Sequence, residues 1–124
     1  MTTTQKGREL AVVAIGDGQM ALVTDAPLSE AATFRRDQGG DALLAAISAA
    51  RCGVHAALVT RVGTDACSEA LLESWDEEGL HLDYANQVAG RNGMTLIGSD
   101  GVVAFREGAA AHLEPKDVAT VPWD

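Results

Sequence analysis

Aromatic residues are scarce in this sequence and make up 4% of its 124 residues. Basic residues are also few, because nine Lys and Arg stand against 18 Asp and Glu, which gives a formal net charge of −9. The nine cations are scattered and never form a run longer than two. A nucleic-acid-binding surface needs clustered cations, so the composition speaks against a nucleic-acid partner.

Long hydrophobic runs are missing as well. The longest apolar runs, such as Leu10–Ile15, are far shorter than the roughly 20 residues of a membrane-spanning helix. The start of the sequence, Met1–Lys6, leads into a strand-like segment without the apolar core and cleavage site of a secretory leader. We therefore expect a cytoplasmic protein without a membrane partner.

Cysteine and histidine are rare and dispersed. Cys52 and Cys67 form no CxxC pair and no Cys/His spacing typical of metal ligands. His55, His81 and His112 include no i,i+4 pair. We predict no metal site, and we expect the two cysteines to be buried free thiols.

Apolar segments dominate what is present, since 47% of the residues are hydrophobic and can form the core of one domain over residues 1–124. Leu10–Ile15, closed by Gly16-Asp17-Gly18, predicts a central strand that is buried on both faces of a mostly parallel sheet. Ala56–Val62 predicts a second buried strand of that sheet.

Two helices are predicted around these strands. The first begins at Asp41, where an acid suits the helix dipole, and ends at Gly53; the second spans Asp65–Glu78 and stops at Gly79. Alternating strands and helices with short connections predict a right-handed parallel α/β layer. The expected core positions recur at helical spacing: Leu43, Leu44, Ile47 and Ala50 in the first helix, and Ala66, Ala70, Leu71, Leu72 and Trp75 in the second.

The remaining segments read as short exposed strands. Asp100-Gly101 is the strongest turn signal in the sequence, and a turn-like segment at 25–29 separates two further candidates. We predict antiparallel pairing among five segments: Met20–Val23, Ala31–Arg35, Tyr84–Val88, Gly93–Gly98 and Val102–Arg106.

Three motifs resemble the pattern of the PfkB (ribokinase-like) carbohydrate kinases. They are Gly39-Gly40-Asp41, Val62-Gly63-Thr64-Asp65 and the segment Glu78–Asp83, which match the family's glycine pair, VGxD turn and EEGVD segment. Phe105–Ala111 and the Ser68 that follows the VGxD turn are similar to the 2-keto-3-deoxygluconate kinases of that family. The resemblance extends from about Leu10 to Val118. It implies a ribokinase-like parallel sheet layer with a small antiparallel β lid at about 20–35 and 84–106, truncated before the second half of the fold.

The resemblance also implies a substrate site at Gly39, Gly40, Asp41, Leu44 and Arg106. A helix amino terminus behind glycines offers N–H groups to sugar oxygens, and an Arg guanidinium pairs with a carboxylate. On physical grounds alone, the glycine pair fits a plain tight turn equally well, and a single Arg at a strand end is most often a solvated cation.

The sequence departs from the family pattern at several positions. Leu44 stands where the family has a substrate-binding asparagine, Ala21 stands where many members carry an acid, and Thr95 and Leu96 lie near the positions of the subgroup's tyrosines. The carboxy-terminal Gly-Ala-Gly-Asp motif, which supplies the catalytic base and the anion hole, does not occur in these residues, and neither does a GxxxxGK[ST] loop. We therefore assign no catalytic residue.

Three functions remain open. The chain is the amino-terminal portion of an ATP- and magnesium-dependent sugar or sugar-acid kinase, a stand-alone sugar-acid-binding or regulatory module, or an inactive remnant. For the whole enzyme the resemblance implies a sugar or sugar acid as the small-molecule partner and pairing of lid strands in a homodimer. We expect this chain alone to bind no nucleotide and to be inactive.

Overall fold

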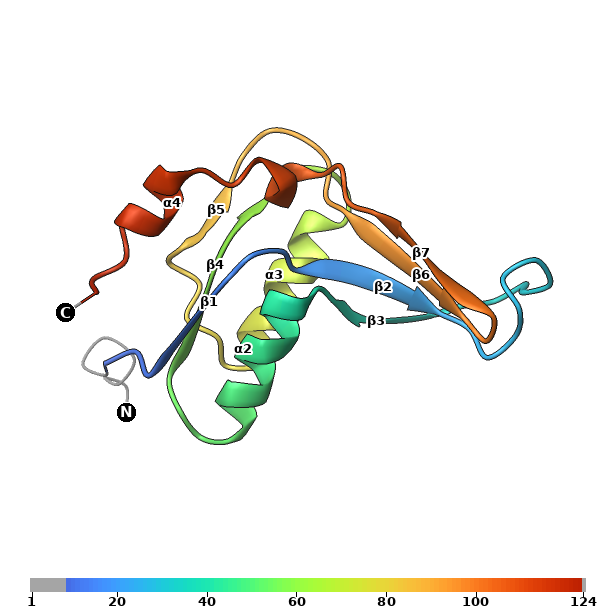
Figure 1. The fold of residues 1–124 in the computed structure, drawn as a ribbon, viewed down its shortest axis with the longest axis horizontal. Coiled ribbons are helices and arrows are strands. Elements are labelled where there is room, and N and C mark those ends of the chain that lie inside the picture. Colours follow the sequence, from blue (N-terminus) through green and yellow to red (C-terminus); the bar gives the residue numbers. More distant parts are fainter. Residues whose placement is uncertain (1–8, 124) are drawn as a thin grey trace.

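The chain contains two β-sheets, one parallel and one mixed, together with several helices (Figure 1). The computed structural model describes residues 9–123. The parallel sheet has the strand order β1-β4-β5, with β1 at Val12–Ile15, β4 at Ala56–Val62 and β5 at Ala85–Gln87. The second sheet, here called the lid, has the order β3-β2-β6-β7, with β2 at Gln19–Val23, β3 at Arg35–Gly39, β6 at Met94–Gly98 and β7 at Gly101–Phe105.

Helices α2 (Asp41–Arg51) and α3 (Ser68–Glu77) complete the parallel layer. Helix α2 packs on β1 and β4, and α3 adds Leu71 and Trp75 to the same core. Trp75, Leu43 and Leu58 are fully buried there. The chain ends with a 3₁₀ helix, η1 (Ala109–His112), and the short helix α4 (Pro115–Ala119), which return over β4. This arrangement confirms the predicted α/β layer.

Strand β1 is not central, contrary to the prediction. It pairs in parallel with β4 alone among the described strands, and Ile15 at its end is 45% exposed. No strand of the described residues covers its other edge, so the apolar run is only half buried. The strand buried on all sides is β4, which lies between β1 and β5.

Several helix and cysteine predictions need correction. Helix α3 begins at Ser68, because Asp65 accepts a hydrogen bond from the N–H of Cys67 in a preceding turn. Leu44 is 45% exposed on the solvent side of α2, and Ala66 is exposed before α3. Cys52 is exposed at the end of α2 and is not a buried thiol.

The strands of the lid fall within residues 19–39 and 94–105, whereas the predicted limits are 20–35 and 84–106. Its second strand is β3, four residues later than the predicted 31–35, and Gln19 pairs with Gly39. Residues 24–34 form a loop. This loop is attached to the turn between β6 and β7, because Asp100 Oδ1 accepts a hydrogen bond from the N–H of Leu28. The predicted hairpin at Asp100-Gly101 is confirmed between β6 and β7.

The predicted lid strand at 84–88 is wrong. It corresponds to β5, which pairs in parallel with β4 through Thr60 and Ala85 in the main sheet. The two halves of the lid, β2–β3 and β6–β7, are joined into one sheet by the parallel pairing of β2 with β6. Residues 9–123 include no helix long and apolar enough to span a membrane. Met1–Lys6 lies outside the described residues.

Candidate functional site

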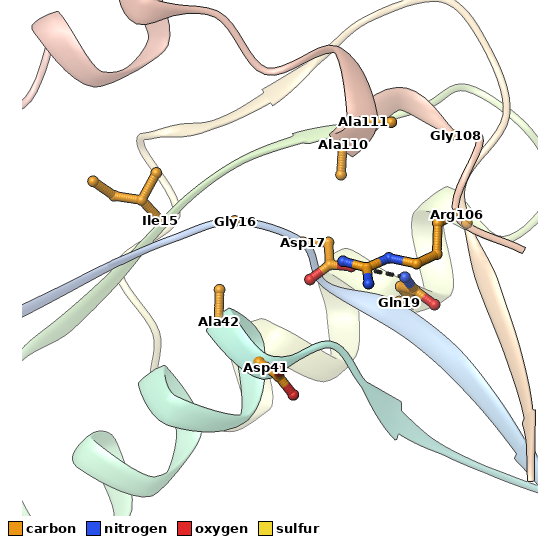
Figure 2. Close-up of a pocket in the computed structure, with 11 residues that line it drawn as sticks. Ile15, Gly16, Asp17, Gln19, Asp41, Ala42, Arg106, Gly108, Ala110 and Ala111 are labelled. Carbon is orange, nitrogen blue, oxygen red and sulfur yellow. Dashed lines mark hydrogen bonds and ion pairs between the residues drawn. The ribbon is translucent and has the colours of Figure 1, made fainter. Parts of the chain in front are cut away.

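Two adjoining cavities lie where the lid meets the parallel layer. The first, of about 420 Å³, is bounded by Ile15, Ala42, Gly108 and Ala110 (Figure 2). The second, of about 300 Å³, lies under the lid strands. Four polar residues line both cavities and form the boundary between them: Asp17, Gln19, Asp41 and Arg106.

Gly40 joins the lid to the layer at the floor of the second cavity. Its φ of +99° is unfavourable for a side chain, and a Cβ there would lie 2.5 Å from the carbonyl oxygen of Asp17. That carbonyl accepts the N–H of Leu43 from the first turn of α2. The close approach brings the amino terminus of α2, with its positive dipole end, beside the loop that follows β1.

A chain of hydrogen bonds crosses the site from the lid to the layer. Arg106 Nη2 donates to Asp17 Oδ2 at 3.2 Å, and Gln19 Nε2 donates to the same oxygen at 2.9 Å. The hydroxyl of Thr95 donates to Gln19 Oε1 at 2.6 Å. Gln19 is 4% exposed, so these bonds fix both ends of its amide.

The ion pair between Arg106 and Asp17 is open to solvent on the arginine side. The Arg106 side chain is 73% exposed, whereas that of Asp17 is 19% exposed. Water screens such a pair, which keeps its net energy small. The Arg106 guanidinium is therefore accessible to an anion from solvent, because its ion pair with Asp17 is weak.

The structure places all five sequence-predicted site residues around the second cavity. Gly39, Gly40 and Asp41 come from the β3–α2 junction, Leu44 from the next turn, and Arg106 from the end of β7. Leu44 presents methyl groups where a polar side chain would offer hydrogen bonds. Whether these residues bind substrate stays a prediction.

Sequence reasoning missed three of the polar residues. Asp17 carried a usable signal, because it follows a strand of a parallel sheet at its carboxyl end, where ligands commonly bind. Gln19 and Thr95 carried none, since their approach depends on the parallel pairing of β2 with β6.

The segment that returns from the lid over β4 closes the first cavity, and a buried ion pair anchors it. Arg61 Nε donates to Asp117 Oδ2 at 2.8 Å, and Asn86 Nδ2 donates to Asp117 Oδ1 at 2.9 Å. Burial alone would raise the pKa of Asp117, but the hydrogen bonds from the Glu114 N–H, Asn86 and Arg61 outweigh it and lower that pKa.

The polar side chains that line the two cavities can form hydrogen bonds and an ion pair with a ligand. Carboxylate and amide oxygens can accept hydrogen bonds from hydroxyl groups, and one guanidinium can bind an anion. The described residues include no group of three metal-ligating side chains. The Gly-Ala-Gly-Asp motif does not occur in the sequence.

Sugar kinases of greater length are among the solved structures that share this fold. A fructokinase from Halothermothrix orenii is 24% identical with a TM-score of 0.79, and the match covers 90% of this chain and 42% of that one. A 2-dehydro-3-deoxygluconokinase from Thermotoga maritima is 23% identical with a TM-score of 0.77, over 88% and 36%. An uncharacterized sugar kinase from Pyrococcus horikoshii in complex with ATP is 20% identical with a TM-score of 0.75, over 86% and 37%.

The chain thus spans less than half the length of these structures. None of the curated proteins matches it. The family model described as pfkB family carbohydrate kinase matches residues 10–124, which include both sheets and every residue of the two cavities. The chain belongs to the pfkB family of carbohydrate kinases.

Proposed function

We propose that this chain is the substrate-binding portion of an ATP-dependent sugar or sugar-acid kinase similar to the 2-keto-3-deoxygluconate kinases, without the catalytic half. The observation that carries the proposal is the convergence of the glycine pair, Asp41 and Arg106 on one cavity beneath the lid. ATP and magnesium serve the whole enzyme, and the complex of the Pyrococcus sugar kinase with ATP supports the nucleotide. A cytoplasmic location, where ATP is plentiful, belongs to the same proposal.

The chain alone is inactive under this proposal. Phosphoryl transfer needs a positioned base and charge stabilisation around the transferred group, and the sequence supplies neither. Purified chain is mixed with ATP, magnesium and a panel of sugars and sugar acids, and release of ADP is followed. Turnover that a point substitution in this chain abolishes would contradict the proposal.

The ligand of the cavity is a hydroxylated carboxylate. Neutral N–H donors at the start of α2 suit hydroxyl groups, and Arg106 supplies a positive charge for the acid. Leu44→Asn tightens binding of 2-keto-3-deoxygluconate and Arg106→Ala weakens it, each by about 1–3 kcal/mol when the bound ligand covers these two side chains. Calorimetric titration measures both, and Arg35→Ala, which removes an exposed cation outside the cavity, is the matched control.

A stand-alone binding module is the second candidate function. The observation in its favour is that both cavities form from this chain alone. The same titration separates both candidates from an inactive remnant: binding by the isolated chain fits either candidate, whereas no binding by a folded Leu44→Asn variant leaves the remnant.

The lid is also the proposed site of homodimer formation. Val102, Val103 and Phe105 on β7 are 63%, 44% and 55% exposed, and β3 and β7 are the edge strands of the lid. Exposed apolar edge strands favour pairing with a second copy. Sedimentation of the chain shows a dimer that Val103→Lys shifts to monomer; identical sedimentation of both proteins would reject the pairing.

A further inference from the structure

The Val62-Gly63-Thr64-Asp65 motif carries much of the family resemblance, yet none of its residues lines either cavity. We infer that Asp65 and Asn92 are positioning residues, whose mutual hydrogen bonds fix the crossing of the lid connections over the layer and so set the cavity wall at Gly93, Arg106 and Gly108.

Asn92 uses its backbone N–H and both polar atoms of its side chain at this crossing. Its backbone N–H donates to Asp65 Oδ2 at 2.8 Å, and its Nδ2 donates to Asp65 Oδ1 at 2.6 Å and to Ser68 Oγ at 2.8 Å. Its Oδ1 accepts the N–H of Gly63 at 2.8 Å. The Asn92 side chain therefore joins the connection before β6 to Gly63, which follows β4, and to Ser68 at the start of α3.

The two connections of the lid hairpin touch each other at the same place. The N–H of Ala109, just after the lid, donates to the carbonyl of Arg91, just before it, at 2.7 Å. A Cβ at Gly108 would overlap the backbone of Asn92 and Gly93, so the two segments are in direct backbone contact. A displacement of Asn92 therefore displaces both connections together.

This crossing borders the first cavity directly. Gly93, Arg106 and Gly108 all line that cavity, and Arg106 directly follows the last residue of β7. The distance from Arg106 to Asp17 therefore depends on where the crossing sits. Asp65 and Asn92 act on the ligand site without touching it.

The carboxylate of Asp65 is held in its charged form. Burial would raise its pKa, but hydrogen bonds from Asn92, the Cys67 N–H and Ser68 outweigh that effect and lower it. Charged acceptors make the stronger hydrogen bonds. The charge of Asp65 thus strengthens the attachment of Asn92.

Amide hydrogen exchange on the full chain tests this role without any ligand. In Asp65→Asn and Asn92→Ala, exchange of the Ala109 amide and of β6 amides accelerates about tenfold or more, while Leu58 in the core strand β4 keeps its rate. Asp25→Asn is the matched control, because it removes an equal charge from an exposed ion pair at the far end of the lid. Unchanged exchange at Ala109, or equal acceleration at Leu58, would overturn the inference.

A reciprocal exchange of the two residues separates positioning from general loss of structure. The double substitution Asp65→Asn/Asn92→Asp reverses donor and acceptor across the pair, and it recovers part of the protection that each single substitution loses. If Asn92→Ala does not fold, Asp65→Asn and the double variant carry the test. No recovery in the double variant counts against the inference.

Ligand titration adds a second, separable readout. Binding of 2-keto-3-deoxygluconate weakens about tenfold in Asp65→Asn and partly returns in the double variant, with Leu58 exchange unchanged. This arm rests on the proposed function. If the wild-type chain binds no sugar acid while the exchange pattern is as expected, the proposed function fails and the positioning role stands.

Discussion

The parallel layer and the lid are stabilised in different ways. All nine residues of the buried hydrophobic cluster belong to α2, β4, α3 and the segment after α3, whereas every residue of β7 is exposed. The layer therefore folds by burial of apolar side chains, which is the larger stabilising contribution. The lid is held by backbone pairing and by its anchors on the layer, so its position can change at lower cost than the core can.

The largest expected effect tests the stability of the layer. Trp75→Ala removes a fully buried side chain and lowers the free energy of unfolding by about 3–5 kcal/mol. Val103→Ala on the exposed lid strand changes it by less than about 0.5 kcal/mol. Urea denaturation of both variants measures the contrast. Similar losses in the two would mean that the lid shares the core.

The second effect lies at the junction of the two regions. Gly40→Ala forces a side chain into a φ of +99° and against the Asp17 carbonyl, so it costs about 3 kcal/mol from backbone strain and overlap together. Gly101→Ala is the matched lid control, since a Cβ there meets open space. Thermal unfolding of the two variants compares them. A mild Gly40→Ala phenotype would show that the junction is pliable.

The third effect concerns acid stability of the anchored end of the layer. Asp117→Asn destabilises the chain by about 1–3 kcal/mol at neutral pH, because a buried acceptor of three hydrogen bonds is weakened. The folded pKa of Asp117 lies below its ordinary value of 3.8, so the stability that its charged form contributes is complete above that pH and is lost as pH falls through the folded pKa. The difference in free energy of unfolding between wild type and variant, measured by urea denaturation at a series of pH values, therefore disappears only below about pH 4. A gap that closes near neutral pH would contradict the lowered pKa.

The smallest effect is at the lid side of the cavity. Asp17→Asn removes the carboxylate that competes for Arg106, so affinity for a sugar acid rises by about fivefold at most, in keeping with an exposed ion pair. Affinity for fructose falls, because a charged acceptor for its hydroxyl groups is lost. Parallel calorimetric titrations give both values. A fall for both ligands would show that Asp17 does not compete with them for Arg106.

The same contrast explains what the sequence could predict. Strand β4 was predicted at Ala56–Val62 and lies there, and α2 starts at the predicted Asp41, because apolar periodicity records burial. The predicted position of β3 is four residues too early, because its first residues, Arg35, Arg36 and Asp37, show no apolar alternation. Strand β5 has three residues of mixed polarity, and only its tertiary pairing with β4 identifies its sheet.

The site divides along the same line. The cavity-lining residues Gly40, Asp41 and Arg106 can be predicted from the sequence because each stands in a local motif that resembles the family pattern, and their role in binding stays a prediction. Asp17 and Gln19 interact with Arg106 and Thr95 across 89 and 76 sequence positions. No local pattern encodes such contacts, because they arise when β2 and β6 pair.

The burial of Trp75 beneath the site gives the protein an optical reporter of its own. Its ring packs against Gly18, next to Asp17 and Gln19, and its Nε1 has no hydrogen-bond partner among the described residues. An indole in such surroundings emits at short wavelength, whereas the 57% exposed Trp123 emits at longer wavelength. The two tryptophans are therefore spectrally separable, and the blue component of the emission reports, without a label, on the chain at Gly18, between the cavity-lining residues Asp17 and Gln19.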